Sequence, residues 1–308
     1  MISKVPVVLA FTPNYFVPAC VTITSILQGS GSVSFHFISL LSEPLPEYMK
    51  EKLIRIGGHR ATYSFINLEG QLQDIYIDEQ YTVAASYRLL LPRLLSEYAK
   101  VLYIDCDIIV NNNLSELYRL DLQGNYLAGV FEVPLDFQIP YMEELGCNPE
   151  EYMNSGFLLM DLQKMREDGL VEQFMKASKV DYLQFPDQDV LNQVCQGRIL
   201  GLPPYNNSIR TFFLPQYRER FLAMYSPKDL LDVNRKGNIH YTGTKPWEAF
   251  TIRFVDWWRV YWTLPKEIKQ EWKMNKKLHY MAMLLNTRAG SKALRSIQAI
   301  YRKIKYSS

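Results

Sequence analysis

The stretch that decides the fold is Lys100-Val-Leu-Tyr-Ile-Asp-Cys-Asp-Ile-Ile-Val110, in which apolar residues flank Asp105 and Asp107 on both sides. Its first half is typical of a buried strand, and the strand ends where the aspartates begin. Upstream, strand and helix patterns alternate, with strands at 5–11, 32–41 and 61–68 and helices at 18–28 and 46–57. This alternation predicts an α/β domain built on a parallel sheet with covering helices. Because ligands bind at the carboxyl ends of such strands, both aspartates lie where a ligand is expected.

The rest of the chain has weaker patterns. We expect strands at 126–131 and 156–161 and helices at 87–98, 162–177 and 188–196. The stretch 203–237, rich in proline, asparagine and aromatic residues, is expected to be irregular. From Lys266 the composition favours helix, so the sequence predicts a domain over 1–265 followed by a helical tail over 266–308.

Charge is unevenly distributed along the 308 residues. The formal net charge is +2, but the last 43 residues hold 11 Lys and Arg against two Glu, while the preceding body has 23 basic residues against 30 acidic ones. Apolar residues of the tail recur at every third or fourth position beside basic ones: Leu294, Ile297, Ile300, Tyr301 and Ile304. This amphipathic pattern predicts binding to an anionic membrane, at about 1 kcal/mol per basic residue near the surface. Nucleic acid is the competing anionic partner, and we expect none because no nucleic-acid-binding motif accompanies the tail.

Cysteine spacing and hydropathy indicate the compartment. The four cysteines lie far apart without a CxxC pair, which favours a reducing environment. The apolar run near the N-terminus is too short for a signal peptide, and no stretch reaches the ~20 apolar residues of a membrane span. We therefore expect a cytoplasmic protein attached peripherally to the inner face of the cell membrane.

Asp105 and Asp107 form the first candidate site. Carboxylates at positions i and i+2 can bind one hard divalent cation, which prefers oxygen ligands. The alternative is a solvated turn, since Asp-x-Asp occurs by chance in many chains. The apolar flanks argue against the turn, because carboxylates in such surroundings are costly to bury without a cation or hydrogen-bond donors.

His240 is the second candidate, in a strand-like segment that breaks into a loop at Gly243. A lone histidine is more often a packed or exposed residue than a ligand. An imidazole that completes a two-aspartate site would suit Mn²⁺. Gly243 permits close backbone approach to a ligand, and Lys245 would suit a phosphate.

Three further polar residues have ordinary explanations on sequence alone. Asp187 stands where a helix begins, as an N-cap or first-turn residue would. Asn154 precedes a strand and fits a turn, and Arg88 at a helix start fits either a phosphate ligand or a solvated side chain.

The order of six motifs carries a family resemblance. They are Asn14-Tyr15, then SYRL at 86–89, KVLYIDCDIIV at 100–110, NSGFLLMDL at 154–162, DQDVLN at 187–192 and HYTGTKPW at 240–247. Together they resemble glycosyltransferase family 8, which includes bacterial lipopolysaccharide galactosyl- and glucosyltransferases and, more distantly, glycogenin. The resemblance spans roughly residues 5 to 250, and several motifs in order are far more specific than any one of them.

The resemblance implies a single nucleotide-diphospho-sugar transferase domain with a Rossmann-like mixed sheet. It implies transfer of a hexose from UDP-galactose or UDP-glucose, with Mn²⁺ (or Mg²⁺) and with retention at the anomeric carbon. The implied acceptor is a hydroxyl of a lipid-linked or cell-surface oligosaccharide. Thr12-Pro13 stands where relatives commonly have an acidic pair, and Glu132 where they often have Asp. A non-catalytic nucleotide-sugar-binding protein that keeps the fold is the alternative function.

The resemblance also assigns roles to single residues. It makes Asp105, Asp107 and His240 the metal ligands, and it places Lys245 at a phosphate. It places Ala10 and Asn14 by the uridine, and Arg88, Asn154, Asp187 and Gln188 by the donor sugar.

Retention of configuration poses a chemical problem at Gln188, which is implied to lie near the anomeric centre on the face opposite UDP. A double displacement needs a carboxylate nucleophile, and an amide is a weak one. The sequence therefore favours a front-face mechanism in which the acceptor attacks from the side that UDP leaves. In that mechanism the Gln188 carbonyl stabilises positive charge, and Asp187 accepts hydrogen bonds from sugar hydroxyls.

Overall fold

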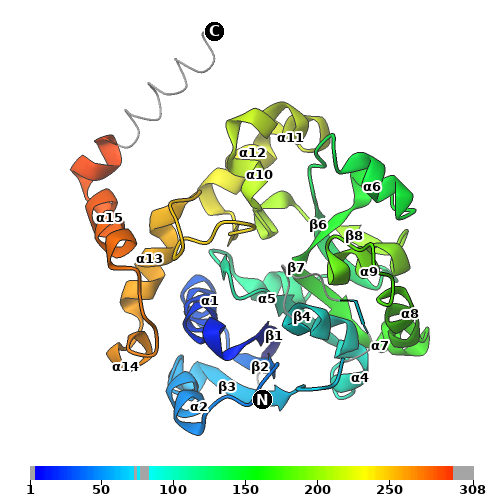
Figure 1. Ribbon diagram of the computed structural model, residues 1–308, viewed down its shortest axis with the longest axis horizontal. Coiled ribbons are helices and arrows are strands. Elements are labelled where there is room, and N and C mark those ends of the chain that lie inside the picture. Colours follow the sequence, from blue (N-terminus) through cyan, green and yellow to red (C-terminus); the bar gives the residue numbers. More distant parts are fainter. Residues whose placement is uncertain (1–3, 73–74, 77–82, 294–308) are drawn as a thin grey trace.

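A mixed sheet runs through the centre of the molecule, with strands in the order β3-β2-β1-β4-β7-β6-β8 (Figure 1). The structure is a computed structural model, which describes residues 4–72, 75–76 and 83–293. Alternate residues of a central strand face opposite cores: Leu102 and Ile104 belong to one, Val101 and Tyr103 to the other. A strand that is buried on both faces carries a continuous apolar run, which explains the deciding stretch of sequence.

The first half of the sheet is parallel, as expected. Its strands are β1 (Val5–Phe11), β2 (Phe35–Leu41), β3 (Ala61–Asn67) and β4 (Lys100–Ile104). The connecting helices are α1 (Phe16–Gly29) and α2 (Glu47–Ile54).

The second half departs from the parallel pattern. β7 (Met153–Asp161) is antiparallel to β4 and to β6 (Leu127–Phe131), while β8 (Ile199–Gly201) is parallel to β6. β7 begins three residues before the expected strand, so Asn154 lies inside the strand and its interpretation as a turn is wrong. The strand extends because Asn154 and Met153 pair with Val130 and Phe131 of β6. Two side chains bond its first backbone groups as well: Ser155 N donates to Gln188 Oε1 and Met153 N to Asn192 Oδ1.

A separate two-stranded sheet joins distant parts of the sequence. β5 (Ile108–Ile109) pairs antiparallel with β9 (Ile239–His240), so that Ile108 lies opposite His240. The next backbone bond runs from Tyr241 N to Asp107 O at 3.1 Å. This pairing brings the Asp-x-Asp stretch against the histidine that follows it by more than 130 positions.

Two expected helices differ in the structure. The helix expected at 87–98 is divided into the 3₁₀ turn η3 (Tyr87–Leu90) and the short helix α4 (Leu91–Leu94), where Pro92 occupies the first turn, and a further short helix, α3 (Val83–Ser86), precedes it. The helix expected at 162–177 is broken into α7 (Leu162–Glu167) and α8 (Leu170–Ala177). The break falls at Gly169, whose φ of 65° is a left-handed conformation that ends a helix.

The stretch expected to be irregular, 203–237, contains several short helices. These are η5 (Pro204–Asn206), α10 (Arg210–Phe213), η6 (Pro215–Tyr217), α11 (Arg218–Met224) and α12 (Pro227–Lys236). Prolines in the first turn start η5, η6 and α12, and Ser226 with Asp229 forms a capping box on α12. The aromatic rings of Phe212 in α10, Phe221 in α11 and Tyr225, which follows α11, contact one another. The remaining helices and 3₁₀ turns of the body are η1 (Pro13–Tyr15), η2 (Gly58–Arg60), α5 (Leu114–Tyr118), α6 (Ile139–Glu144), η4 (Pro149–Glu151) and α9 (Pro186–Val194).

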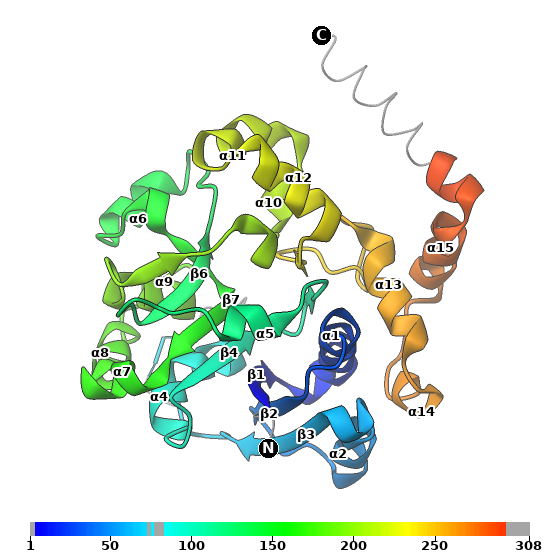
Figure 2. The same cartoon turned by 180° about the vertical axis from the view of Figure 1, so that it is seen from behind.

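The helices near the C-terminus pack on the body beside α1 (Figure 2). They are α13 (Phe254–Thr263), α14 (Lys266–Lys269) and α15 (Lys276–Asn286). Ile268 and Ala282 are fully buried, and Lys52 of α2 forms an ion pair with Glu271. The division into 1–265 and 266–308 stays a prediction, and the stripe from Leu294 to Ile304 lies outside the described residues. Among the described helices none is both long and apolar enough to cross a bilayer.

Candidate functional site

A cavity of about 490 Å³ opens at the carboxyl ends of β1 and β4 and the start of β7. The sequence-predicted residues that line it are Ala10, Arg88, Asp105, Asp107, Asn154, Asp187, Gln188, His240, Gly243 and Lys245. Asn14 is the exception, because its side chain is exposed and does not line the cavity. Tyr15 and Thr12 line the cavity there instead.

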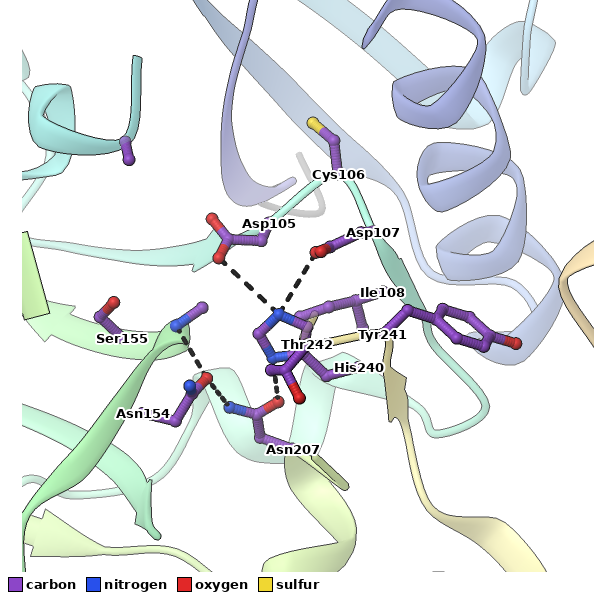
Figure 3. Close-up of polar contacts among 12 residues, drawn as sticks. Asp105, Cys106, Asp107, Ile108, Asn154, Ser155, Asn207, His240, Tyr241 and Thr242 are labelled. Atoms are coloured by element: carbon purple, nitrogen blue, oxygen red, sulfur yellow. Dashed lines mark hydrogen bonds and ion pairs between the residues drawn. The ribbon is translucent and has the colours of Figure 1, made fainter. Parts of the chain in front are cut away.

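Asp105, Asp107 and His240 form a cluster in which one ligand atom from each residue lies within 4.8 Å of the others. His240 Nε2 lies 3.3 Å from Asp107 Oδ1 and 3.9 Å from Asp105 Oδ2 (Figure 3). Two carboxylates and one imidazole nitrogen are a donor set suited to Mn²⁺.

Each carboxylate has one oxygen anchored and the other aimed at the imidazole. Asp105 Oδ1 accepts from Arg88 Nη2 at 2.9 Å and from the Tyr103 hydroxyl at 3.0 Å. Asp107 Oδ2 accepts from Lys245 Nζ. Asp107 Oδ1 is buried and has no hydrogen-bond partner within the described part of the chain. A buried carboxylate oxygen without a donor is costly, so this atom supports a cation site.

The charged form of Asp107 is stabilised although the residue is 8% exposed. Burial alone raises the pKa of its carboxyl, but the ammonium group of Lys245 outweighs burial and holds this pKa well below its usual range. The carboxylate is therefore ionised at neutral pH, as a metal ligand must be.

Gly156 makes room for the cluster. A methyl group at this position of β7 would lie 2.6 Å from Asp105 Oδ2 and would also overlap His240 Cε1. Only glycine lets Asp105 and His240 approach each other across this strand.

A buried ion-pair network adjoins the cluster on the side of α9. Arg88 Nε lies 3.0 Å from Asp187 Oδ2, and the same guanidinium bonds Asp105 and the Ser155 carbonyl. Burial lowers the pKa of Arg88, but Asp105 and Asp187 raise it well above its ordinary value. Burial raises the pKa of Asp187, and Arg88 opposes this rise. Arg88 thus lies between the cation cluster and Asp187. Its side chain is buried, so the interpretation of Arg88 as a solvated residue is wrong.

Gln188 is held in a hydrogen-bond network at the start of α9. Its Oε1 accepts from Ser155 N at 3.0 Å and Asn154 Nδ2 at 3.1 Å, while its Nε2 donates to Glu132 Oε1 at 3.3 Å. Burial raises the pKa of Glu132, and the hydrogen bonds from Asn154 and Gln188 lower it in part. The amide orientation of Gln188 is therefore fixed, with its carbonyl oxygen bonded to two donors.

Sequence reasoning missed several residues of the site. Tyr103 is an apolar strand position whose hydroxyl reaches Asp105. Arg210 lines the cavity with its Nε buried and without a hydrogen-bond partner among the described residues. Asn207 contacts the His240 ring. No spacing signal could have found Asn207 or Arg210, because both lie in the stretch that had no recognisable pattern.

The mixed sheet, with a cavity at the carboxyl ends of its central strands, agrees with the nucleotide-diphospho-sugar transferase fold that the family resemblance implies. Residues 6–251 match the family described as glycosyl transferase family 8. The chain belongs to this family.

Curated relatives include transferases from two bacteria. The chain is 29% identical over 252 residues to a lipopolysaccharide 1,2-glucosyltransferase of Escherichia coli K12, covering 78% of this chain and 71% of the relative. It is 28% identical over 262 residues to the glycosyltransferase GlyF of Streptococcus pneumoniae serotype 4. That match covers 83% of this chain and 60% of GlyF, so the chain spans less than two thirds of that relative.

Solved structures share the fold. The galactosyltransferase LgtC, crystallised with donor and acceptor sugar analogues, superposes with a TM-score of 0.69 at 23% identity over 87% of this chain and 100% of LgtC. The bifunctional glycosyltransferase WbbM superposes with a TM-score of 0.71 at 22% identity over 88% of this chain and 52% of WbbM. The predicted fold class, a mixed sheet with covering helices of the sugar-nucleotide transferase type, is confirmed.

Proposed function

We propose that the chain is a metal-dependent retaining hexosyltransferase that uses UDP-galactose or UDP-glucose. The observation that carries this proposal is the convergence of Asp105, Asp107 and His240 beside the Arg88–Asp187 pair in one cavity. A cation cluster next to buried hydrogen-bonding side chains suits a substrate that joins a diphosphate to a sugar.

Asp105, Asp107 and His240 would hold Mn²⁺ or Mg²⁺, and the unpartnered Asp107 Oδ1 supports this fit. A divalent cation bound there neutralises charge on the diphosphate leaving group. Lys245, whose ammonium group already bonds Asp107 and the Tyr241 carbonyl, adds a second positive charge beside the diphosphate.

The reaction breaks the bond between the anomeric carbon and the β-phosphate oxygen and forms a bond from that carbon to the acceptor oxygen. The acceptor hydroxyl gives its proton to the departing phosphate oxygen. Asp187, held by Arg88 and by Ser155 Oγ at 3.0 Å, accepts hydrogen bonds from sugar hydroxyls. Gln188, fixed by Ser155 N and Asn154, presents a carbonyl dipole to the positive anomeric centre and forms no covalent bond.

The acceptor we propose is a hydroxyl of a lipid-linked or cell-surface oligosaccharide. The similarity to the Escherichia coli lipopolysaccharide 1,2-glucosyltransferase supports this class. The choice between galactose and glucose rests on the orientation of one hydroxyl group.

We further propose a cytoplasmic location with the tail on the anionic inner face of the membrane. The described part of this region supports it, because α15 exposes apolar and basic side chains together. Tyr280 is 66% exposed and Leu284 64%, and Lys276 and Lys277 are exposed beside them. Basic residues at an anionic surface and apolar ones at the acyl boundary are the two sources of interfacial binding.

The activity is tested with a panel of UDP-sugars, each incubated with and without Mn²⁺, with release of UDP as the measurement. We expect Mn²⁺-dependent UDP release from UDP-galactose or UDP-glucose and none after chelation. Tight binding of UDP-sugars without release or transfer under any condition would instead support the non-catalytic binding protein.

A further inference from the structure

The two ring nitrogens of His240 face different partners. Nε2 faces the carboxylates of Asp107 and Asp105, and Nδ1 lies 3.0 Å from Asn207 Oδ1 (Figure 3). A neutral imidazole carries one proton, and the nitrogen without it is the one that can bind a metal ion. The neighbour of Nδ1 therefore decides whether Nε2 is a ligand.

The orientation of the Asn154 amide is fixed by two groups whose roles cannot be exchanged. The Gly156 backbone N–H can only donate, and it lies 3.2 Å from Asn154 Oδ1. The Glu132 carboxylate accepts from Asn154 Nδ2 at 2.8 Å. A flipped Asn154 amide would lose both hydrogen bonds, so the oxygen of Asn154 faces Asn207.

The orientation of the Asn207 amide follows from that of Asn154. Asn207 Nδ2 donates to Asn154 Oδ1 at 2.8 Å, which leaves the oxygen of Asn207 facing His240 Nδ1. An amide oxygen can only accept, so the imidazole proton must lie on Nδ1 for this contact to be a hydrogen bond.

The backbone holds Asn207 in this place. Ser208 forms an isolated bridge with Ile239, and its carbonyl accepts from His240 N at 3.0 Å. Asn207 is 0% exposed. Pairing with β9 therefore fixes Asn207 beside the ring, where bulk water does not compete for Nδ1.

We propose that Asn207, oriented by Asn154, is a positioning residue that keeps the proton of His240 on Nδ1 and so presents Nε2 to the divalent cation. This inference rests on the proposed metal site, and it gives Asn207 and Asn154 a role in orienting one of the metal ligands. The Asn154 amide, which the family resemblance places by the donor sugar, has both of its ends engaged in this chain of hydrogen bonds.

Affinity for Mn²⁺ is the first test, measured by electron paramagnetic resonance of free Mn²⁺ in the presence of UDP and without any acceptor. Asn207→Leu keeps the side-chain volume and removes the acceptor, and we expect Mn²⁺ binding to weaken about 10- to 100-fold. Asn207→Asp keeps an acceptor for Nδ1–H, and we expect its affinity to stay within a few fold of the wild type. Asn206→Leu is the matched control, since Asn206 is buried next in sequence but bonds Pro203; its Mn²⁺ affinity should not change.

The tautomer of His240 is the second test, read by ¹⁵N NMR of histidine-labelled protein with Mg²⁺ and UDP, with His240→Gln to assign the signal. We expect a protonated Nδ1 in the wild type and loss of that single tautomer in Asn207→Leu. Two results would overturn the role of Asn207 while leaving the metal site intact. One is a wild-type His240 protonated at Nε2, and the other is an Asn207→Leu protein that binds Mn²⁺ as tightly as the wild type does. A wild type that binds no Mn²⁺ with UDP would overturn the metal site as well, which separates the two failures.

Discussion

Arg88 Nε lies 3.0 Å from Asp187 Oδ2, and this buried contact connects the cation cluster to the start of α9. The arginine also bonds Asp105 at 2.9 Å and stacks over the Tyr103 ring at 4.2 Å. One guanidinium thereby balances two carboxylates that would otherwise repel each other across the cavity.

Removing this arginine should destabilise the fold. Arg88→Met leaves two carboxylates uncompensated, and we expect a loss of about 3–5 kcal/mol in the free energy of unfolding. Urea unfolding followed by circular dichroism measures it. Arg93→Met, at an exposed position of α4, serves as the control and should cost less than about 0.5 kcal/mol. An Arg88→Met protein as stable as this control would contradict the buried network.

Asp107 and Gln188 should differ in how much activity their loss removes. Asp107→Ala takes away a cation ligand, and we expect metal-dependent turnover to vanish. Gln188→Ala removes a carbonyl dipole and its hydrogen bonds to Ser155 N and Asn154 but no cation ligand, so we expect a partial loss, of about 10²- to 10³-fold in kcat. Steady-state kinetics with Asp121→Ala, an exposed aspartate, as control measures both. An active Asp107→Ala enzyme would rule out the metal assignment.

A methyl group at position 156 should close the cation cluster. Gly156→Ala places carbon against His240 and 2.6 Å from Asp105 Oδ2, so we expect Mn²⁺ affinity in calorimetry to fall at least about tenfold, as for changes that displace a ligand. Gly129→Ala in the neighbouring β6 is the control. Its methyl meets Met153 Sδ at 2.9 Å, away from the cluster, and it should change stability but not affinity. Equal Mn²⁺ affinities for both variants would contradict this geometry.

The partly buried carboxyl of Glu132 should make stability depend on pH. Its pKa is raised by burial, so the folded state binds this proton more tightly than the unfolded state does. The stability from this group is present below the unfolded pKa and is lost as pH rises through the folded one. The Glu132→Gln variant has no proton to lose at this position, whereas the wild type is destabilised as Glu132 ionises. The melting temperature of the variant minus that of the wild type should therefore increase from pH 4 to pH 7. A difference in melting temperature that is constant over this range would show that the folded protein does not raise the pKa of Glu132.

The tail should supply the membrane affinity. A chain ending at Ala293 loses the apolar stripe and four basic residues, Arg295, Arg302, Lys303 and Lys305. We expect at least about tenfold weaker co-sedimentation with liposomes rich in phosphatidylglycerol and little binding of either form to neutral liposomes. A cut at Pro265 is unsuitable because it would expose the core around Ile268. Equal sedimentation of both chains would end the membrane assignment.

Local patterns were sufficient to predict the parallel half of the fold. β1 and β4 are apolar on both faces, and a chain with alternating strands and helices has few other ways to bury them. The break at Gly169 and the short helices after Pro203 could not be predicted, because tertiary packing and single-residue geometry decide them. Amphipathic periodicity is lost in helices of only one or two turns.

The site could be predicted only in part for a similar reason. Asp105 and Asp107 are only two positions apart in the sequence, and motif order indicated His240 and Asp187. Asn207 acts through a backbone pairing with β9 that no local pattern shows. The resemblance places Asn14 by the uridine, which stays a prediction; in the 3₁₀ turn η1 (Pro13–Tyr15) Asn14 is exposed and Tyr15 lines the cavity.

The stereochemistry of transfer tests the central claim most directly. The purified chain is incubated with the UDP-hexose that releases UDP, with Mn²⁺ and an oligosaccharide acceptor, and the anomeric configuration of the product is read by NMR. The account predicts a product with the donor's configuration, formed with Mn²⁺ and abolished in Asp107→Ala. An inverted product, or one formed equally by Asp107→Ala, would contradict it.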